Sequence, residues 1–267
     1  MTASRTAITW RWLALAAIVG NIVFNYLSTA LGLHGDTVGS VAQSYPSLFA
    51  PAPWAFSIWG LIYAAFLAWG VAGVLPRNYT VGLFDRIAPP LTLVNVLASL
   101  WIAVFEERLM VVSVAIIVLM LALACLMFVE AHRSPLTRWV TVPFALFLGW
   151  ISVATIANVT ILLVAQGWRG GPIGEPTLAA IMTSVAGLLG VVIAVRFRDF
   201  VVPAVIAWAA TALYLANLGR SELAADIALG AAIVNAATAA SVALSRITFG
   251  DRGSATRASG TRPGSVH

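Results

Sequence analysis

Long apolar stretches separated by short polar segments dominate the hydropathy pattern of this chain. A helix of about 20 apolar residues crosses the roughly 30 Å hydrocarbon core of a bilayer. Eight stretches approach or exceed this length, at about 12–33, 54–75, 88–105, 109–129, 139–165, 177–195, 200–218 and 223–245. Because backbone polar groups in lipid must be satisfied internally, the pattern predicts an all-α, polytopic membrane helical bundle of about eight transmembrane helices.

The positions of the arginines predict how this bundle is oriented. All 15 basic residues are arginines. If the N-terminus is cytoplasmic, twelve of them fall in cytoplasmic segments, and the segments outside hold Arg108, Arg169 and Arg220. Cytoplasmic loops of membrane proteins carry an excess of positive charge. We therefore expect both termini to be cytoplasmic.

The composition agrees with a membrane protein. Apolar residues make up 61% of the chain and charged residues 9%, whereas soluble domains contain about 25% charged residues. The net charge of +5 is explained by cytoplasmic flanks that face anionic lipid, without a nucleic-acid partner. The abundance of alanine and the use of arginine in place of lysine favour a bacterial origin. We expect a multi-pass protein of the bacterial plasma membrane, with the lipid bilayer as its surroundings.

Ionisable residues are absent from the middle of the predicted spans, which narrows the possible functions. Such residues mark proton relays and ion pathways, so a proton-coupled pump is disfavoured. A retinal Schiff base is excluded, because the chain has no lysine. The histidines lack metal-ligand spacing, and neither paired carboxylates nor a nucleophile with its base occur near the membrane interior. We therefore expect a protein that binds no metal and no cofactor and that is not an enzyme.

Amides and indoles do occur within the spans. Asn25, Asn95, Trp101 and Asn158 lie in three predicted helices. Each amide has a simple interpretation as an interhelical hydrogen bond, worth about 0.6 to 2 kcal/mol. The predicted topology also places Asn25, Trp101 and Asn158 in the outer half of the membrane, where they could line a common site.

The segment 48–63 is a proline-rich loop that leads into an aromatic helix. Pro51 and Pro53 can start a helix, because a first-turn proline loses no needed hydrogen bond. Four aromatic residues follow: Trp54, Phe56, Trp59 and Tyr63. The rings could pack in the core or line a small-molecule pocket. The long outside loop from His34 to Pro53 precedes them, and a loop of this length often acts as a lid.

Two segments resemble the TspO/MBR family of translocator proteins, also called tryptophan-rich sensory proteins. The first is Pro51 to Tyr63, where the prolines, Trp54, Phe56, Trp59 and Tyr63 occupy the family's pattern at the start of its second helix. The second is Pro143 to Asn158, which is similar to the family's fifth helix, with Trp150 and an Ala-Thr-x-x-Asn element. Asn95 and Trp101 depart from the pattern, because they are six residues apart instead of one turn.

The resemblance implies a fold for part of the chain and a class of ligand. Family members usually have five helices, so the resemblance implies a TspO-like bundle for residues 1–165. The hydropathy pattern predicts an additional three-helix transmembrane unit at 166–247, and the Gly, Ser, Thr and Arg content of 248–267 predicts a disordered cytoplasmic tail. The implied function is binding of a planar apolar ligand for transport or sensing, either a tetrapyrrole such as protoporphyrin or haem or a sterol-like lipid, often as a homodimer. The candidate ligand-binding residues are Asn25, Trp54, Phe56, Trp59, Tyr63, Asn95, Trp101, Trp150, Thr155 and Asn158.

An alternative function remains open at this point. The chain could be a carrier for a small uncharged solute that uses all eight helices, including the amides of Asn217 and Asn235. Alanines at 228, 232, 236 and 240 follow the small-xxx-small pattern of close helix contacts. This pattern predicts packing either within the bundle or against a second subunit.

Overall fold

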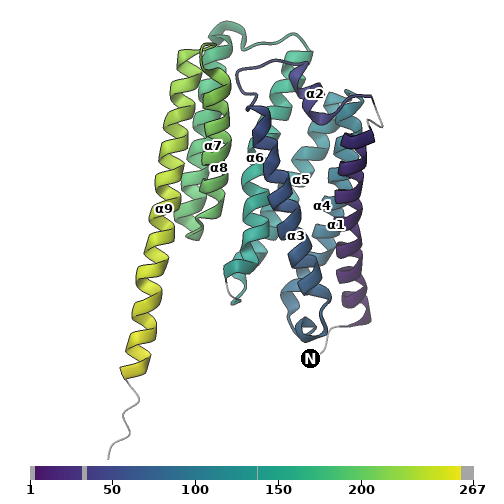
Figure 1. Ribbon diagram of the computed structural model, residues 1–267, viewed down its shortest axis with the longest axis vertical. Helices are drawn as coiled ribbons and strands as arrows, with labels where there is room; N and C mark the ends of the chain where they lie inside the picture. Colours follow the sequence, from purple (N-terminus) through teal and green to yellow (C-terminus); the bar gives the residue numbers. More distant parts are fainter. Residues whose placement is uncertain (1–3, 32–34, 137, 260–267) are drawn as a thin grey trace, which may run out of the picture.

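The computed structural model describes residues 4–31, 35–136 and 138–259, and this part of the chain is helical without strands (Figure 1). The long helices are α1 (Arg5–Leu31), α3 (Ile58–Val74), α4 (Gly82–Glu106), α5 (Met110–Arg133), α6 (Val142–Ala165), α7 (Gly174–Phe197), α8 (Val201–Asn217) and α9 (Glu222–Ser259). Shorter pieces connect them: α2 (Val38–Gln43), η1 (Pro53–Ser57), η2 (Pro76–Asn78), η3 (Arg138–Thr141) and η4 (Gly171–Ile173).

Each of the eight apolar stretches forms a helix, which confirms the polytopic bundle. In the described part of the chain, seven helical segments are long and apolar enough to cross a membrane. The eighth, α8, has 17 residues and is about 25 Å long at 1.5 Å per residue. It joins the two ends of the bundle, because Asp199 before it pairs with His132 at the end of α5, whereas Asn217 at its other end contacts the loop before η1.

Helix α4 starts earlier than the hydropathy pattern indicates. The expected span begins at 88, but the helix begins at Gly82 and includes Pro89 and Pro90. The added first turn carries Asp85 and Arg86, which form ion pairs with Arg11 of α1 and Glu130 of α5. Charges that suggested a loop are therefore neutralised by partners on neighbouring helices.

Helix α9 also continues beyond its expected end. It remains helical to Ser259, past residue 248 where the disordered tail was expected to begin. A helix that is already formed adds residues at little cost, since nucleation is the unfavourable step. Residues 260–267 of the expected tail lie outside the described part of the chain.

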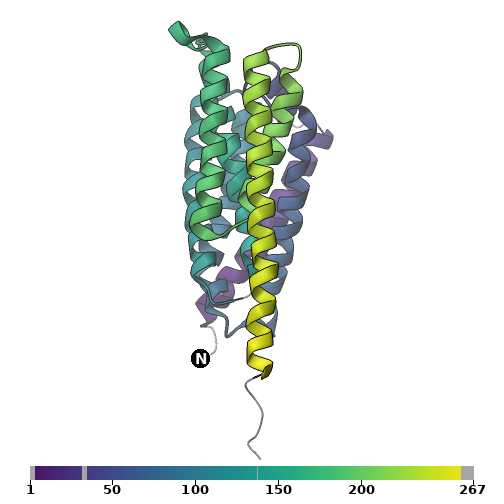
Figure 2. The ribbon, with the colours of Figure 1, turned by 90° about the vertical axis from the view of Figure 1, so that its left-hand side faces the viewer.

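The last three helices stand beside α6 in a single elongated bundle (Figures 1 and 2). Helix α8 packs against α6, and α9 packs against α7 and α8. Ala228, Ala232 and Asn235 are buried in these contacts, and Asn235 Nδ2 donates to the Gly187 carbonyl over 3.2 Å. A Cβ on Gly190 would clash with Asn235 Oδ1, so the close approach of α7 and α9 requires glycine here.

The small-residue pattern of α9 is therefore divided between two environments. Its first members, Ala228 and Ala232, pack inside the bundle, while Ala236 and Ala240 are exposed. The exposure of Ala236 and Ala240 does not test whether a second subunit packs there, so the homodimer stays a prediction.

The end of the bundle that carries the N-terminus is held by buried polar contacts. Arg11 is 2% exposed. Its guanidinium pairs with Asp85 over 2.7 Å and donates to the carbonyls of Gly73, Asn78 and Val81 over 2.9 to 3.1 Å. These contacts tie α1 to the α3–α4 connection.

Asn95, one of the predicted site residues, forms a hydrogen bond that joins two helices of the bundle. Asn21 of α1 donates to Asn95 Oδ1 of α4 over 3.1 Å, and Asn95 Nδ2 donates to the Leu91 carbonyl over 2.8 Å. Both side chains are buried. For Asn95 the simple interpretation, an interhelical hydrogen bond, describes the observed contact.

Candidate functional site: a lidded aromatic cavity

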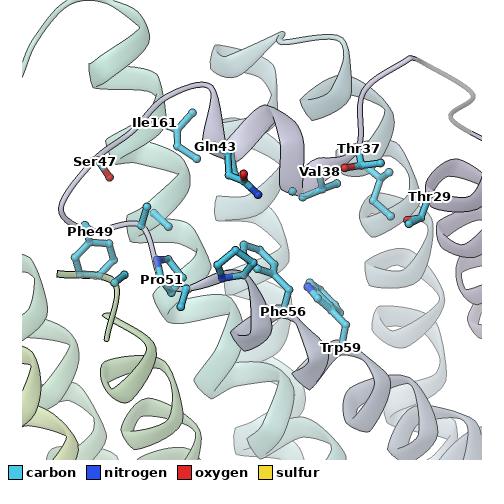
Figure 3. Close-up of a pocket in the computed structure, with 18 of the residues that line it drawn as sticks. Thr29, Thr37, Val38, Gln43, Ser47, Phe49, Pro51, Phe56, Trp59 and Ile161 are labelled. Carbon is cyan, nitrogen blue, oxygen red and sulfur yellow. The ribbon is translucent and has the colours of Figure 1, made fainter. Parts of the chain in front are cut away.

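A cavity of about 610 Å³ lies at the end of the bundle opposite to the N-terminus. Pockets for drug-sized ligands usually measure about 300–1,000 Å³. Its walls come from α1, α3, α4 and α6, and its cover comes from the loop between α1 and α3. Figure 3 shows Phe56 and Trp59 on one side and Val38 and Gln43 opposite them.

The aromatic side of the cavity is formed by η1 and α3. Pro53 occupies the first turn of η1, where it needs no hydrogen-bond partner, and the helix then places Phe56, Trp59 and Tyr63 along the cavity. Trp59 and Tyr63 are four residues apart, so their rings stack on one face, with centroids 5.5 Å apart. Together the three residues present an extended aromatic surface to the cavity.

Trp101 of α4 supplies the facing ring, and its orientation is fixed by a chain of hydrogen bonds. Its indole N–H donates to Asn158 Oδ1 over 2.9 Å, and Asn158 Nδ2 donates to the Ser113 hydroxyl over 3.0 Å. Trp101 also stacks on Phe105 at a centroid distance of 4.8 Å. Asn158 therefore positions a cavity residue without lining the cavity.

The cover of the cavity, here called the lid, consists of residues 36–52 and includes α2. The Thr37 hydroxyl accepts a hydrogen bond from the Ser40 N–H, and the Ser40 hydroxyl accepts one from the Thr37 N–H. This capping box stabilises a six-residue helix that would be marginal alone. From the lid, Thr37, Val38, Gln43 and Phe49 reach the cavity.

The lid is anchored to several parts of the bundle. Asp36 pairs with Arg108 in the α4–α5 turn over 2.6 Å. The Leu48 N–H donates to Glu175 of α7 over 2.8 Å, and the Leu48 carbonyl accepts from Asn217 Nδ2 of α8 over 2.9 Å. The last three helices thus contribute to the closure of a cavity whose walls belong mainly to the first five spans.

Several polar groups of the cavity wall have no protein partner. Among the described residues, the Asn25 amide, the Trp59 indole N–H and the Tyr63 hydroxyl make no hydrogen bond, although all three residues line the cavity. Polar groups next to apolar surface gain from a partner. The cavity can therefore hold an apolar body and orient its polar edge.

The geometry can be compared with known proteins. Residues 11–246 match the family described as TSPO-like protein. This chain belongs to the TSPO-like family. No curated protein and no solved structure matches it.

The family match extends beyond the five-helix segment, because it includes the helices that follow residue 165. It confirms the expected relationship to TspO, and with the seven apolar helices it describes a multi-pass membrane protein of the TspO type. The division of the chain into units 1–165, 166–247 and 248–267 stays a prediction.

The structure brings half of the predicted site residues together. Asn25, Phe56, Trp59, Tyr63 and Trp101 line the cavity of this TSPO-like protein. Their binding of a ligand stays a prediction, as it does for the others.

The other five predicted residues do not line the cavity. Trp54 packs edge-on against Trp208 with centroids 4.5 Å apart, and Trp150 is buried behind Phe56 at 5.6 Å. The Thr155 hydroxyl donates to the Ile151 carbonyl of its own helix. Asn95 and Asn158 are engaged by Asn21 and Trp101.

The sequence predicts a lid in the loop from His34 to Pro53, but it did not identify which lid residues reach the cavity, nor Arg220, which also lines it. The lid left a readable signal, since Thr37 and Ser40 have the spacing of a capping box. For Arg220 the sequence predicts only a position outside the membrane, and no role in a site.

Proposed function

We propose that this TSPO-like protein binds a planar apolar ligand in the lidded cavity for transport or sensing, with a tetrapyrrole or a sterol-like lipid as the ligand class. The observation that carries the proposal is a cavity of about 610 Å³ with aromatic side chains on its walls. Aromatic faces stack favourably on flat apolar molecules. The unpartnered groups of Asn25, Trp59 and Tyr63 supply the few polar contacts typical of such sites.

The lid supports a role that includes uptake and release. It is a separate loop with its own short helix, and its polar anchors to the bundle are one ion pair and individual hydrogen bonds, while Val41 and Phe49 pack into the core. Loops that cover binding sites commonly open and close.

Titration of the purified protein with protoporphyrin IX in mild detergent tests the proposal. We expect saturable quenching of tryptophan fluorescence and about tenfold weaker binding in Trp59→Ala, because a large ring contact is lost. Trp139→Ala is the matched control, since Trp139 is an exposed indole at the opposite end of the bundle. Equal affinity in wild type and Trp59→Ala would place the binding site elsewhere.

The molecule that co-purifies with the protein distinguishes the two ligand classes. A Soret band in the absorbance spectrum supports a tetrapyrrole, whereas a colourless lipid found by mass spectrometry supports the sterol-like class. Uptake of a small solute into liposomes that persists in Trp59→Ala would instead favour the carrier hypothesis.

A further inference from the structure

The three arginines at the lidded end of the bundle differ in their partners. Arg108 pairs with Asp36, and Arg169 pairs with Glu175 over 3.2 Å while also donating to the Pro46 carbonyl. Arg220, in the turn between α8 and α9, forms no ion pair with any described residue. Its guanidinium makes one long contact of 3.4 Å, to the Ala216 carbonyl.

Arg220 is also the member of this set that lines the cavity. None of the described lining residues is acidic. Glu222 is two residues away in the sequence, but it is exposed and forms no ion pair with Arg220 in the described part of the chain. The rim of an apolar cavity therefore carries a positive charge that no carboxylate of the described structure neutralises.

A guanidinium in this position favours an anionic partner for two reasons. Its planar fork of N–H donors matches a carboxylate in two parallel hydrogen bonds. A positive charge beside low-dielectric walls also attracts anions more strongly than the same charge on an open surface. The apolar walls would be left for the remainder of the ligand.

We propose that the ligand of this cavity is an apolar molecule that carries a carboxylate, and that Arg220 binds this carboxylate at the rim. The inference rests on the proposed function and specifies its ligand class. Phe56, Trp59 and Trp101 contact the apolar body, and Asn25 and Tyr63 bind neutral polar groups. A residue between the last two helices thus determines specificity in a cavity built mainly by the earlier ones.

Two pairs of probes test the proposal, each with the same apolar body with and without the acid. They are protoporphyrin IX with its dimethyl ester, and cholesteryl hemisuccinate with cholesterol. In at least one pair we expect the acid to bind roughly tenfold more tightly, the size expected for a charge-assisted hydrogen bond. The pair in which this happens identifies the apolar body.

Substitutions assign the preference to Arg220. Arg220→Gln should bind the acid and the neutral member of a pair equally, with the affinity for the neutral member unchanged. Arg220→Lys should restore part of the preference, because it keeps the charge and loses the fork. Arg77→Gln is the control, since Arg77 is exposed in η2 at the other end of the bundle.

The outcomes separate this inference from the proposed function. Equal binding of acid and neutral members by the wild type overturns the inference and leaves the proposed function standing. A preference that survives in Arg220→Gln overturns the role of Arg220. Absence of saturable binding for all four probes overturns the proposed function and the inference with it.

Discussion

The two ends of the bundle use ion pairs in different ways. At the end with the N-terminus, Arg11 is enclosed by Asp85 and three backbone carbonyls, and Trp69, Phe84 and Phe144 pack close together nearby. At the lidded end, Asp36 and Arg108 are 39% and 45% exposed, and the interior beneath the lid is hollow.

The difference indicates one fixed end and one that can open. Removing one partner of a buried pair leaves a charge and hydrogen-bonding groups unsatisfied, which is strongly destabilising. Exposed pairs contribute little, because water competes for both partners. The buried contacts of Arg11 hold helices together at the first end, whereas the exposed pair of Asp36 and Arg108 holds a cover in place at the second.

The largest effect is expected from Arg11→Met. The substitution leaves Asp85 and three carbonyls without their partner, so we expect a loss of about 3 kcal/mol in the free energy of unfolding. Unfolding in mixed detergent and SDS micelles measures this loss. Arg5→Met, an exposed position on the same helix, should change little, and equal effects of the two variants would contradict the comparison.

A smaller effect is expected from the anchors of Leu48. Glu175→Ala and Asn217→Leu each remove one hydrogen bond to its backbone, worth about 1 kcal/mol. The double variant should release protoporphyrin IX roughly tenfold faster, measured by recovery of tryptophan fluorescence after dilution. Glu222→Ala, which removes an exposed acid from the first turn of α9, should leave the rate unchanged. Faster release in this control would show that loss of any acidic residue at this end accelerates release, whether or not it anchors Leu48.

The smallest effect is expected from the exposed pair of the lid. The hydrogen bond from Arg108 lowers the pKa of Asp36 below its ordinary value of 3.8. Because this pKa is lower in the folded state, the pair stabilises the lid above pH 3.8 and loses this effect as the pH falls through the lowered value.

A spin label on the lid measures this change. Attached in Gln43→Cys, with Cys125→Ser to remove the other thiol, the label should become slightly more mobile as the pH falls below 3.8. Asp36→Asn should already show the more mobile spectrum at neutral pH. A spectrum in Asp36→Asn that equals the wild-type spectrum would show that the ion pair does not restrain the lid.

Most of the fold could be predicted, because transmembrane helices are marked by length and hydropathy alone. The start of α4 could not, since Asp85, Arg86 and two prolines suggest a loop until the partners Arg11 and Glu130 are known. Those partners are far away in the sequence. Hydropathy therefore locates helices better than it locates their ends.

The site was predicted in part for a similar reason. Phe56, Trp59 and Tyr63 follow each other along one helix start, so local spacing shows that they act together. Trp150 and Asn158 face the packed interior because of how α6 meets α3 and α4, which local spacing does not reveal. The position of Arg220 beside the cavity depends on the fold of the last helices.

The double anchor of Leu48 has a mechanical consequence. Its N–H is bound by α7 and its carbonyl by α8, so displacement of the lid at this residue detaches it from two helices at once. Entry of a molecule between α1, α3, α4 and α6 that lifts Leu48 would be transmitted to the ends of α7 and α8. Occupation of the cavity would thereby be transmitted to α7 and α8, of which only α8, through Ala216, contributes a described residue to the cavity wall.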